Sequence, residues 1–364
     1  MISTCLATIY FVSLVIAQVK GGPGHLPAVF VSYLCIIHLL FCKEQISLDK
    51  DTSIPQVFLI IAAVLSLAFN LNSRSLTYVL GFIINIIIYN NIFKYISLKH
   101  FKIFFIFLFL TIFYPIHNGN QLCSIYGNSN ALGMILLCLF YFLLLLWEDK
   151  IFIIFVSIIL SYILLLTGNR SGIISFAVLI VIYFINKKFN KIYTYLLFLI
   201  LLSGVIFYLA YCVITANNLL YQMDIKYYNR NFLYASQRDT IIKAAIPEIL
   251  KKPFGLGFGC IDPSAMKEFG IKVTSPHNAY LKMGLEGGLL FLIAYIFLIL
   301  QAIRKAEYPV TVAMLIAFSI RVFFDIATPF GYSIISALLI APYYIERGIK
   351  QQRLSNRVRW KFMP

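Results

Sequence analysis

Three short segments of this sequence carry side chains that could bind a phosphate or move a proton. The first, at residues 167–172, reads Thr-Gly-Asn-Arg-Ser-Gly, and its Arg170 is the only charged residue between Lys150 and Lys187. A guanidinium can hold two oxygens of one phosphate. Arg170 is therefore a candidate phosphate ligand. The alternative is an arginine that extends to the lipid headgroups for solvation alone.

The second segment begins with Ser-Gln-Arg-Asp at residues 236–239. Beyond it, Ile241, Ala245 and Ile249 recur at helical spacing, which predicts an amphipathic helix over residues 238–250, lying along the membrane surface. Arg238, at its start, is a candidate for a second phosphate contact, although the charge pattern alone favours a solvated helix face. The glycine-rich stretch 255–259 lacks the Lys-Ser/Thr ending of a P-loop and predicts a tight turn.

The third segment reads Ser-Pro-His-Asn-Ala-Tyr-Leu at residues 275–281 and is followed by Glu286-Gly287-Gly288. Because the pKa of an unperturbed histidine is about 6.5, His277 is a candidate general base. A structural role is the alternative for a lone histidine. Asn278 and Tyr280 adjoin it. Glu286 would lie roughly two and a half helical turns further along, as a polar partner or as a structural group.

Two further sets of charged residues are candidates for a chemical role. Asp49-Lys50-Asp51 matches the D-x-D pattern of metal–nucleotide-sugar sites. It lies in a short loop without a soluble domain around it, so we interpret it as solvated loop charge. Arg321 and Asp325, four residues apart, could pair on one helix face or contact a donor. No cluster of residues has metal-ligand spacing, so we predict neither a metal nor a cofactor.

The elements that position these segments are predicted from composition. Of 364 residues, 61% are hydrophobic and 12% are charged, which excludes a soluble domain and a disordered chain. The apolar runs are continuous, whereas the strands of a membrane barrel alternate in polarity. At roughly twenty residues per span, we predict an all-α polytopic membrane protein with about twelve transmembrane helices. They fall at approximately 3–19, 26–42, 54–69, 76–93, 101–116, 130–147, 151–167, 171–186, 192–216, 279–300, 308–324 and 330–345.

The basic residues orient this bundle. The net charge is +16, and the surplus of Lys and Arg in cytoplasmic loops explains it without a nucleic-acid partner. With both termini cytoplasmic, the short loops on the outer side hold only Lys20, Arg74 and Arg170 as basic residues. Cys123 and Cys260 fall in outer loops and could form a disulfide.

Four regions of the chain follow from this topology. Residues 1–216 form a transmembrane bundle of about nine helices, and residues 279–345 form another of about three. Between them, residues 217–278 make a large periplasmic loop that contains short helices. Residues 346–364 form a basic cytoplasmic tail.

Taken together, the segments resemble the O-antigen polymerase and ligase superfamily of bacterial membrane glycosyltransferases. The resemblance covers roughly residues 120–300. It rests on the Gly-Asn-Arg-Ser-Gly turn, on Arg238 followed by Lys-Lys-Pro-Phe-Gly-Leu-Gly-Phe-Gly at 251–259, on Pro-His-Asn-Ala-Tyr-Leu at 276–281, and on the Asn-rich stretch 126–133. It implies a many-span fold with one large outer loop and a donor glycan carried on a polyprenyl pyrophosphate.

The resemblance also implies roles for individual residues. In that family two outer-face arginines hold the pyrophosphate and a histidine activates the acceptor hydroxyl, which assigns these roles to Arg170, Arg238 and His277. The match at Arg238 departs from the family, which often has an aromatic residue where this chain has Ile241, so Arg230 is the alternative. Further candidates for substrate binding are Asn278, Tyr280, Glu286 and Arg321.

The resemblance places the protein in the bacterial inner membrane, with the active site facing the periplasm. We favour a polymerase that joins lipid-linked repeat units, because such sequences are diverse and this one is short, rich in Phe and Tyr and poor in charge. A ligase that transfers the glycan to lipid A core is the alternative. The expected partners are the lipid-linked donor, the glycan acceptor, membrane lipids and a chain-length regulator protein.

A transporter, such as a flippase for the same lipid-linked glycan, is the alternative from another class. Twelve spans fit a flippase, but its cavity should carry charges on many helices. Here the charges within predicted spans are few and late in the chain: Lys282, Glu286, Arg321 and Asp325.

Overall fold

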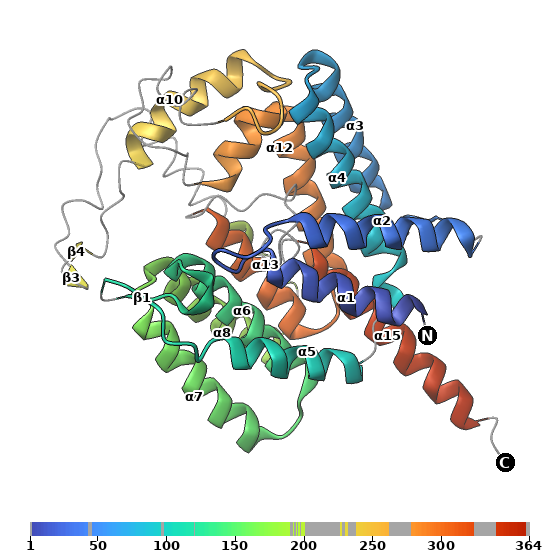
Figure 1. The fold of residues 1–364 in the computed structure, drawn as a ribbon, viewed down its shortest axis with the longest axis vertical. Coiled ribbons are helices and arrows are strands. Elements are labelled where there is room, and N and C mark those ends of the chain that lie inside the picture. The colour runs from blue at the N-terminus through green and yellow to red at the C-terminus, as the bar shows by residue number, and fades with distance from the viewer. Residues whose placement is uncertain are drawn as a thin grey trace.

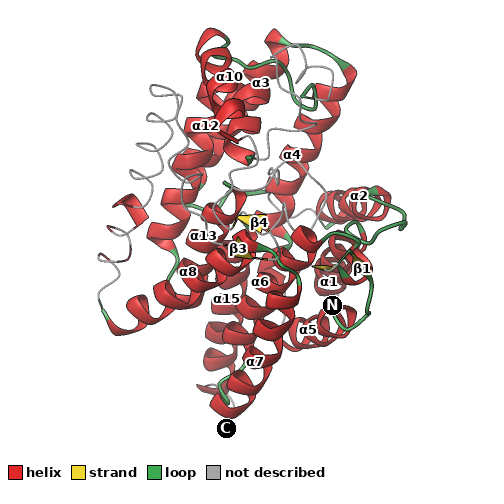
Figure 2. Ribbon diagram, turned by 90° about the vertical axis from the view of Figure 1, so that its left-hand side faces the viewer, coloured by secondary structure: helices red, strands yellow, loops and turns green. Residues whose placement is uncertain are grey.

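The computed structural model describes residues 2–42, 46–95, 98–119, 121–189, 192, 194, 196, 198–200, 226–227, 230–231, 238–261, 278–323 and 340–361. These residues are almost entirely helical (Figure 2). The helices of the first half are α1 (Ile2–Ile16), α2 (Leu26–Phe41), α3 (Ser53–Phe69), α4 (Ser73–Asn91), α5 (Leu98–Thr111), α6 (Ser129–Leu146), α7 (Lys150–Leu166) and α8 (Arg170–Lys188). Those of the second half are α10 (Arg238–Lys251), α12 (Ala279–Lys305), α13 (Pro309–Val322) and α15 (Ala341–Lys361).

Short elements connect these helices. Single 3-10 turns lie at Phe93–Tyr95 and Ser124–Tyr126. Strand β1 (His117–Asn118) pairs antiparallel with β2 (Gln121–Leu122), so that His117 lies opposite Leu122. Strand β3 (Lys226–Tyr227) pairs in the same way with β4 (Arg230–Asn231).

The predicted all-α class is confirmed, and the helix bounds follow the predicted spans closely. Among the described residues, α6, α8 and α12 are long and apolar enough to cross a membrane, and α1, α2, α3, α7 and α13 are shorter apolar helices. Most of the predicted span 192–216 and of the span 330–345 lies outside the described residues. The count of about twelve spans therefore stays a prediction.

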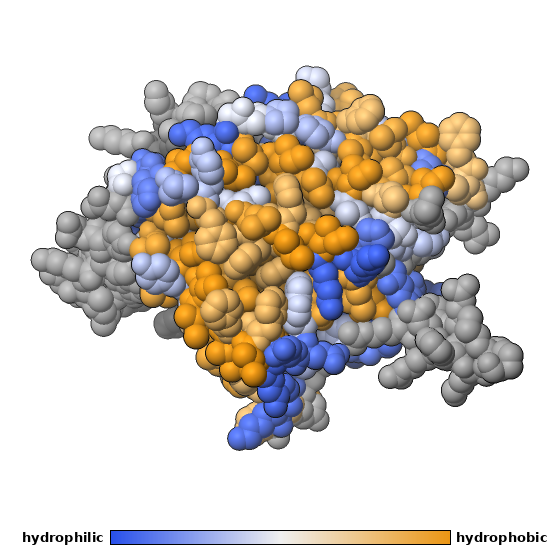
Figure 3. Space-filling view, turned by 60° about the horizontal axis from the view of Figure 1, so that its bottom comes forward, coloured by the Kyte–Doolittle hydropathy of each residue, from blue (hydrophilic) through white to orange (hydrophobic). Residues whose placement is uncertain are grey.

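Side chains on the bundle surface are those of a membrane protein. Along α7, Leu160 and Leu164 face the core, whereas Phe155, Ile158 and Tyr162 are each more than 60% exposed. Figure 3 shows a broad hydrophobic face with hydrophilic residues at its margins. Contiguous apolar surface of this extent is not tolerated in water, so these helices face lipid.

An asparagine or aspartate side chain caps the N-terminus of several of these helices. Asn72, Asn128, Asp149, Asn169 and Asn278 each accept a hydrogen bond from a backbone N–H in the first turn of the helix that follows. Such caps satisfy amide groups that a helix leaves without a partner. They fix where α4, α6, α7, α8 and α12 begin.

The core is built around α6 and α13. Helix α6 is buried over nearly its whole length, and α13 packs against α6, α8 and α12. In Figure 1, α13 lies between a group formed by α5, α6, α7 and α8 and a group formed by α3, α4, α10 and α12. Helix α13 is therefore the element that joins the two groups.

Loops gather at two ends of the bundle. At one end, Lys20 N donates to Ile125 O at 3.0 Å and Asn70 Nδ2 donates to Gly255 O at 3.2 Å. At the other end, Ser47 N donates to Asn91 Oδ1 at 3.0 Å. Figure 1 shows α10 and β1 on the left of the molecule, and the N-terminus and α15 on the right. The first end holds the loops predicted to be outside, and the second holds those predicted to be cytoplasmic.

Helix α10 forms as predicted, but its apolar face does not lie on the membrane surface. Ile241, Ile242 and Ile249 are buried against Leu281 and Leu285 of α12. The amphipathic pattern alone could not tell a lipid surface from a protein surface, because both bury the same stripe of side chains.

Candidate functional site

Arg170 is the first residue of α8, directly after a tight turn that leaves α7. The turn uses Gly168, whose φ of 60° lies in the left-handed region that favours glycine. Asn169 caps α8, and its Oδ1 accepts hydrogen bonds from Gly172 N at 2.9 Å and from the Ser171 hydroxyl at 3.0 Å. The half-buried Arg170 is thus held at a helix N-terminus, where the backbone itself favours anions.

A second arginine reaches the same turn from α13. Arg321 is fully buried, and its Nη1 donates to Asn169 Oδ1 at 3.0 Å. Its Nη2 donates to the carbonyl of Asn130, in the first turn of α6, at 3.2 Å. Asn169 Nδ2 in turn donates to Ser129 O at 3.0 Å. These contacts, here called the Asn169–Arg321 cluster, tie the N-termini of α6 and α8 to the C-terminal turn of α13.

Close packing at this junction leaves no room for a side chain at position 133. A Cβ atom added at Gly133 of α6 would lie 2.4 Å from Asn169 Nδ2, far inside van der Waals contact. Gly133 therefore lets the amide of Asn169 approach the backbone of α6 and reach Ser129 O.

The start of α12 meets the same end of α13. Asn278 is buried and caps α12 by accepting from Leu281 N at 3.1 Å. Two residues further along the chain, the Tyr280 hydroxyl donates to Ser319 O, two residues before Arg321, at 2.9 Å. The structure therefore brings four predicted site residues, Arg170, Arg321, Asn278 and Tyr280, to one end of the bundle.

For three other predicted residues, the structure describes at most the backbone. Arg238 begins α10, which packs against the first turns of α12, but its side chain lies outside the described residues. His277 and Asp325 also lie outside them. His277 directly precedes Asn278, the cap of α12. The role of His277 as the base therefore stays a prediction.

Glu286 lies on a different side of α12, against the glycine-rich turn. Leu256 N donates to Leu285 O at 2.8 Å and Gly257 N donates to Glu286 O at 3.0 Å. Helix α12 is interrupted at Gly288, with φ 82° and ψ 175°, and a Cβ atom there would lie 2.1 Å from Pro253 O. The turn predicted at 255–259 is confirmed. Its glycines allow it to pack into the break in α12.

The Glu286 side chain is almost completely buried at this break. Its Oε1 has no hydrogen-bond partner among the described residues, and the Lys282 ammonium lies 3.9 Å from it. An ammonium this close compensates a buried carboxylate in part. The position suits the structural role that the sequence left open for Glu286.

Asn169 and Asn130 were not among the predicted site residues, although both stand in motifs that carry the resemblance. The signal was present, since Asn169 directly precedes an apolar helix and Asn130 lies in the first turn of another. What the sequence did not reveal was their shared partner, because Arg321 lies more than 150 residues away along the chain.

At the opposite end of α12, the D-x-D motif is ion-paired rather than solvated, which corrects the prediction. Lys305 Nζ lies 2.9 Å from Asp51 Oδ1, and Arg347 Nη2 lies 3.1 Å from both Asp49 Oδ2 and Asp51 Oδ2. The hydrogen bond from Lys305, together with the charge of Arg347, lowers the pKa of Asp51. We call this group the Asp49–Asp51 cluster.

Within the described residues, no three His, Cys, Asp or Glu side chains are grouped as metal ligands. Cys123 and Cys260 are both free thiols, so the disulfide that the sequence allowed is not formed in the structure.

Comparison with known proteins gives a family match. A family model described as O-antigen ligase matches residues 155–296. The matched segment contains Arg170, Arg238 and His277 and ends within α12. It confirms the predicted resemblance to the O-antigen polymerase and ligase superfamily over this segment. A search of curated proteins and a search of solved structures find no match.

Proposed function

We propose that the protein is an O-antigen polymerase of the inner membrane, which joins polyprenyl-pyrophosphate-linked repeat units on the periplasmic face. The family match to residues 155–296 carries the superfamily in this proposal, and the choice of polymerase over ligase rests on the short, Phe- and Tyr-rich and charge-poor sequence. The gathering of Arg170, Arg321, Asn278 and Tyr280 at one end of the bundle supports it. Both termini are cytoplasmic in this proposal, and the active site is at the other end.

The reaction is a single inverting displacement. The acceptor hydroxyl attacks the anomeric carbon of the donor sugar, and His277 takes the proton. The bond between that carbon and the pyrophosphate oxygen breaks, and the lipid pyrophosphate leaves with the electron pair. Arg170 and Arg238 stabilise the negative charge that develops on the leaving group, as charge-assisted hydrogen bonds do in other transferases. In this scheme the guanidiniums supply the charge that a divalent ion supplies elsewhere.

Arg321 and Asn169 support the turn that carries Arg170. Because Arg321 is fully buried and donates to Asn169 and to Asn130 O, we assign it to positioning the Arg170 turn rather than to direct contact with the donor. Asn278 and Tyr280 have the corresponding role for His277, since they fix the first turn of α12 to the cap and to α13.

The test is polymerisation by the purified full-length protein in vesicles that contain lipid-linked repeat units, with chelator present. We expect chain lengthening. Removing a general base costs roughly 10²–10⁴-fold, and removing one charge-stabilising donor costs roughly 10²–10³-fold. His277→Ala and Arg170→Ala should therefore lose rate by these factors. His117→Ala, on strand β1, and Arg74→Ala, which donates to Gly259 O, are the matched controls.

Normal chain lengthening by His277→Ala would refute the assignment of the base, and unchanged donor use by Arg170→Ala would refute the pyrophosphate contact. Transfer to lipid A core, with no lengthening of lipid-linked units, would assign the protein to the ligases instead. Movement of the lipid-linked glycan across the bilayer without new glycosidic bonds would assign it to the flippases.

A further inference from the structure

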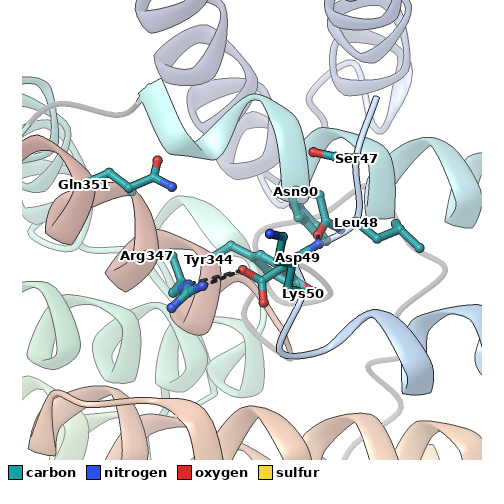
Figure 4. Close-up of a pocket in the computed structure, with 10 residues that line it drawn as sticks. Ser47, Leu48, Asp49, Lys50, Asn90, Tyr344, Arg347 and Gln351 are labelled. Carbon is teal, nitrogen blue, oxygen red and sulfur yellow. Dashed lines mark hydrogen bonds and ion pairs between the residues drawn. The ribbon is translucent and has the colours of Figure 1, made fainter. Parts of the chain in front are cut away.

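A cavity of about 370 Å³ lies next to the Asp49–Asp51 cluster, at the end of the bundle away from Arg170. Its wall consists of the loop before α3, the last turn of α4 and the first turns of α15. Figure 4 shows Lys50, Asn90, Arg347 and Gln351 around it. No residue of the proposed reaction lines this cavity.

The acceptor groups in the wall are already satisfied by the protein. Asp49 Oδ1 accepts from the Tyr343 hydroxyl at 2.9 Å, and Asp49 Oδ2 accepts from Arg347 Nε at 3.2 Å. Asn90 Oδ1 accepts from Asp49 N at 2.6 Å. The Tyr344 hydroxyl is held by Thr52 and Gln56. A ligand that mainly offers hydrogen-bond donors would therefore find few acceptors here.

Donor groups, in contrast, are left over. In the part of the chain that the structure describes, the ammonium of Lys50, the amide of Gln351 and Nη1 of Arg347 make no hydrogen bond or ion pair, while Nε and Nη2 of Arg347 hold the aspartates. Lys50 and Gln351 are exposed, and the Arg347 side chain is 32% exposed. Two of these donors, on Lys50 and Arg347, are cationic. They therefore favour a negatively charged ligand that is rich in acceptor oxygens.

The surroundings of the cavity indicate where such a ligand comes from. Ile46, directly before the wall residue Ser47, is an apolar side chain that is 47% exposed. The cavity therefore has an exposed apolar side chain beside its wall, as a site at a lipid surface would. Beyond it, α15 runs on to Lys361, and the chain after Glu346 contains basic residues but no Asp or Glu.

We propose that this cavity binds the phosphate of an anionic phospholipid headgroup in the leaflet at that end of the bundle. Lys50, Nη1 of Arg347 and Gln351 donate to the phosphate oxygens, and the acyl chains lie along the exposed side chains near Ile46. Anionic leaflets attract basic residues beside membrane helices. The site is independent of the proposed transferase activity, because it shares no residue with it.

The test measures which lipids stay bound to the purified full-length protein. The protein is prepared in nanodiscs of phosphatidylcholine mixed with phosphatidylglycerol, transferred to detergent and examined by native mass spectrometry. We expect retained phosphatidylglycerol. In Lys50→Gln the apparent affinity should fall about fivefold, which corresponds to the roughly 1 kcal/mol that one basic residue contributes near an anionic membrane. Gln351→Ala should fall less. Lys150→Gln, an exposed lysine at the start of α7, is the matched control.

Equal losses in Lys50→Gln and Lys150→Gln would overturn the proposal, because the lipid would then follow overall charge and not the cavity. Inorganic phosphate distinguishes the source of the phosphate. If excess phosphate leaves the bound lipid in place, the lipid assignment stands. If phosphate alone raises the thermal stability of wild-type protein but not of Lys50→Gln, and no lipid is retained, the ligand is a soluble phosphate and the lipid assignment fails.

Discussion

The two ends of the bundle both use a buried or half-buried arginine to join helices, but they satisfy it differently. At one end, Arg321 donates to the amide oxygen of Asn169 and to the carbonyl of Asn130. At the other end, Arg347 binds the carboxylates of Asp49 and Asp51, and Lys305 binds Asp51. Neither amides nor carbonyls titrate, whereas carboxylates do. The comparison therefore predicts that acid and salt act on the second cluster more than on the first.

The largest expected effect is on the Asn169–Arg321 cluster. Arg321→Met removes the two charge-assisted hydrogen bonds that the buried guanidinium donates to Asn169 Oδ1 and Asn130 O, which should cost about 3 kcal/mol of unfolding free energy. Thermal unfolding in detergent measures this loss. Arg304→Met is the control: it removes an exposed arginine in the last turn of α12, where surface interactions contribute at most about 1 kcal/mol, and should change stability less.

A smaller loss is expected from Gly133→Ala, because the added Cβ would displace Asn169. Overpacking of this kind costs about 1–3 kcal/mol. A double-mutant cycle with Asn169→Ala identifies the cause, since truncating Asn169 should remove most of the penalty of the added methyl group. An unchanged penalty in the Asn169→Ala background would show that Asn169 is not what Gly133 accommodates.

The smallest effect at neutral pH is expected from Asp51→Asn. The Asp51 and Lys305 side chains are 30% and 39% exposed, and an ion pair this exposed contributes about 0.5 kcal/mol, which salt screens further. Because the folded pKa of Asp51 is lowered, its contribution is fully present above the unfolded pKa of about 3.9 and is lost as pH falls through the folded pKa. Unfolding should therefore depend less on acid pH in Asp51→Asn than in wild type.

Arg321→Met is the control for this pH dependence. Its unfolding curve should shift by a similar amount at neutral and at acid pH, since the acceptors that it loses do not titrate in this range. If the unfolding of wild type and of Asp51→Asn depends on pH in the same way, the predicted difference between the two ends is wrong.

Much of the candidate site could be predicted from the sequence. The apolar runs predicted the helices, including those that begin after Asn169 and Asn278. The family motifs predicted Arg170 as a site residue, and the segment that contains it matches the family model. These features are local, because a helix and its cap depend on residues within one or two turns.

Two predictions depended on distant contacts and were changed by the structure. The amphipathic face of α10 is covered by Leu281 and Leu285 rather than by lipid. The Asp49-Lys50-Asp51 loop is held by Lys305 and Arg347 rather than by water. The sequence also left open whether Cys123 and Cys260 pair, and in the structure both are free thiols. A pattern of polar and apolar residues does not say which surface will cover it.

By itself, the sequence determined an all-α membrane protein and the approximate bounds of its helices, because apolar runs and helical periodicity act over a few positions. Only the tertiary structure decided that Asn169 shares its amide with Arg321, that the glycines at 255–259 fit a break at Gly288, and that Arg347 faces a cavity. These contacts join residues that are far apart in the chain. Such partners are determined by complementary shape and by the need to pair buried donors and acceptors, and a local stretch of sequence specifies neither.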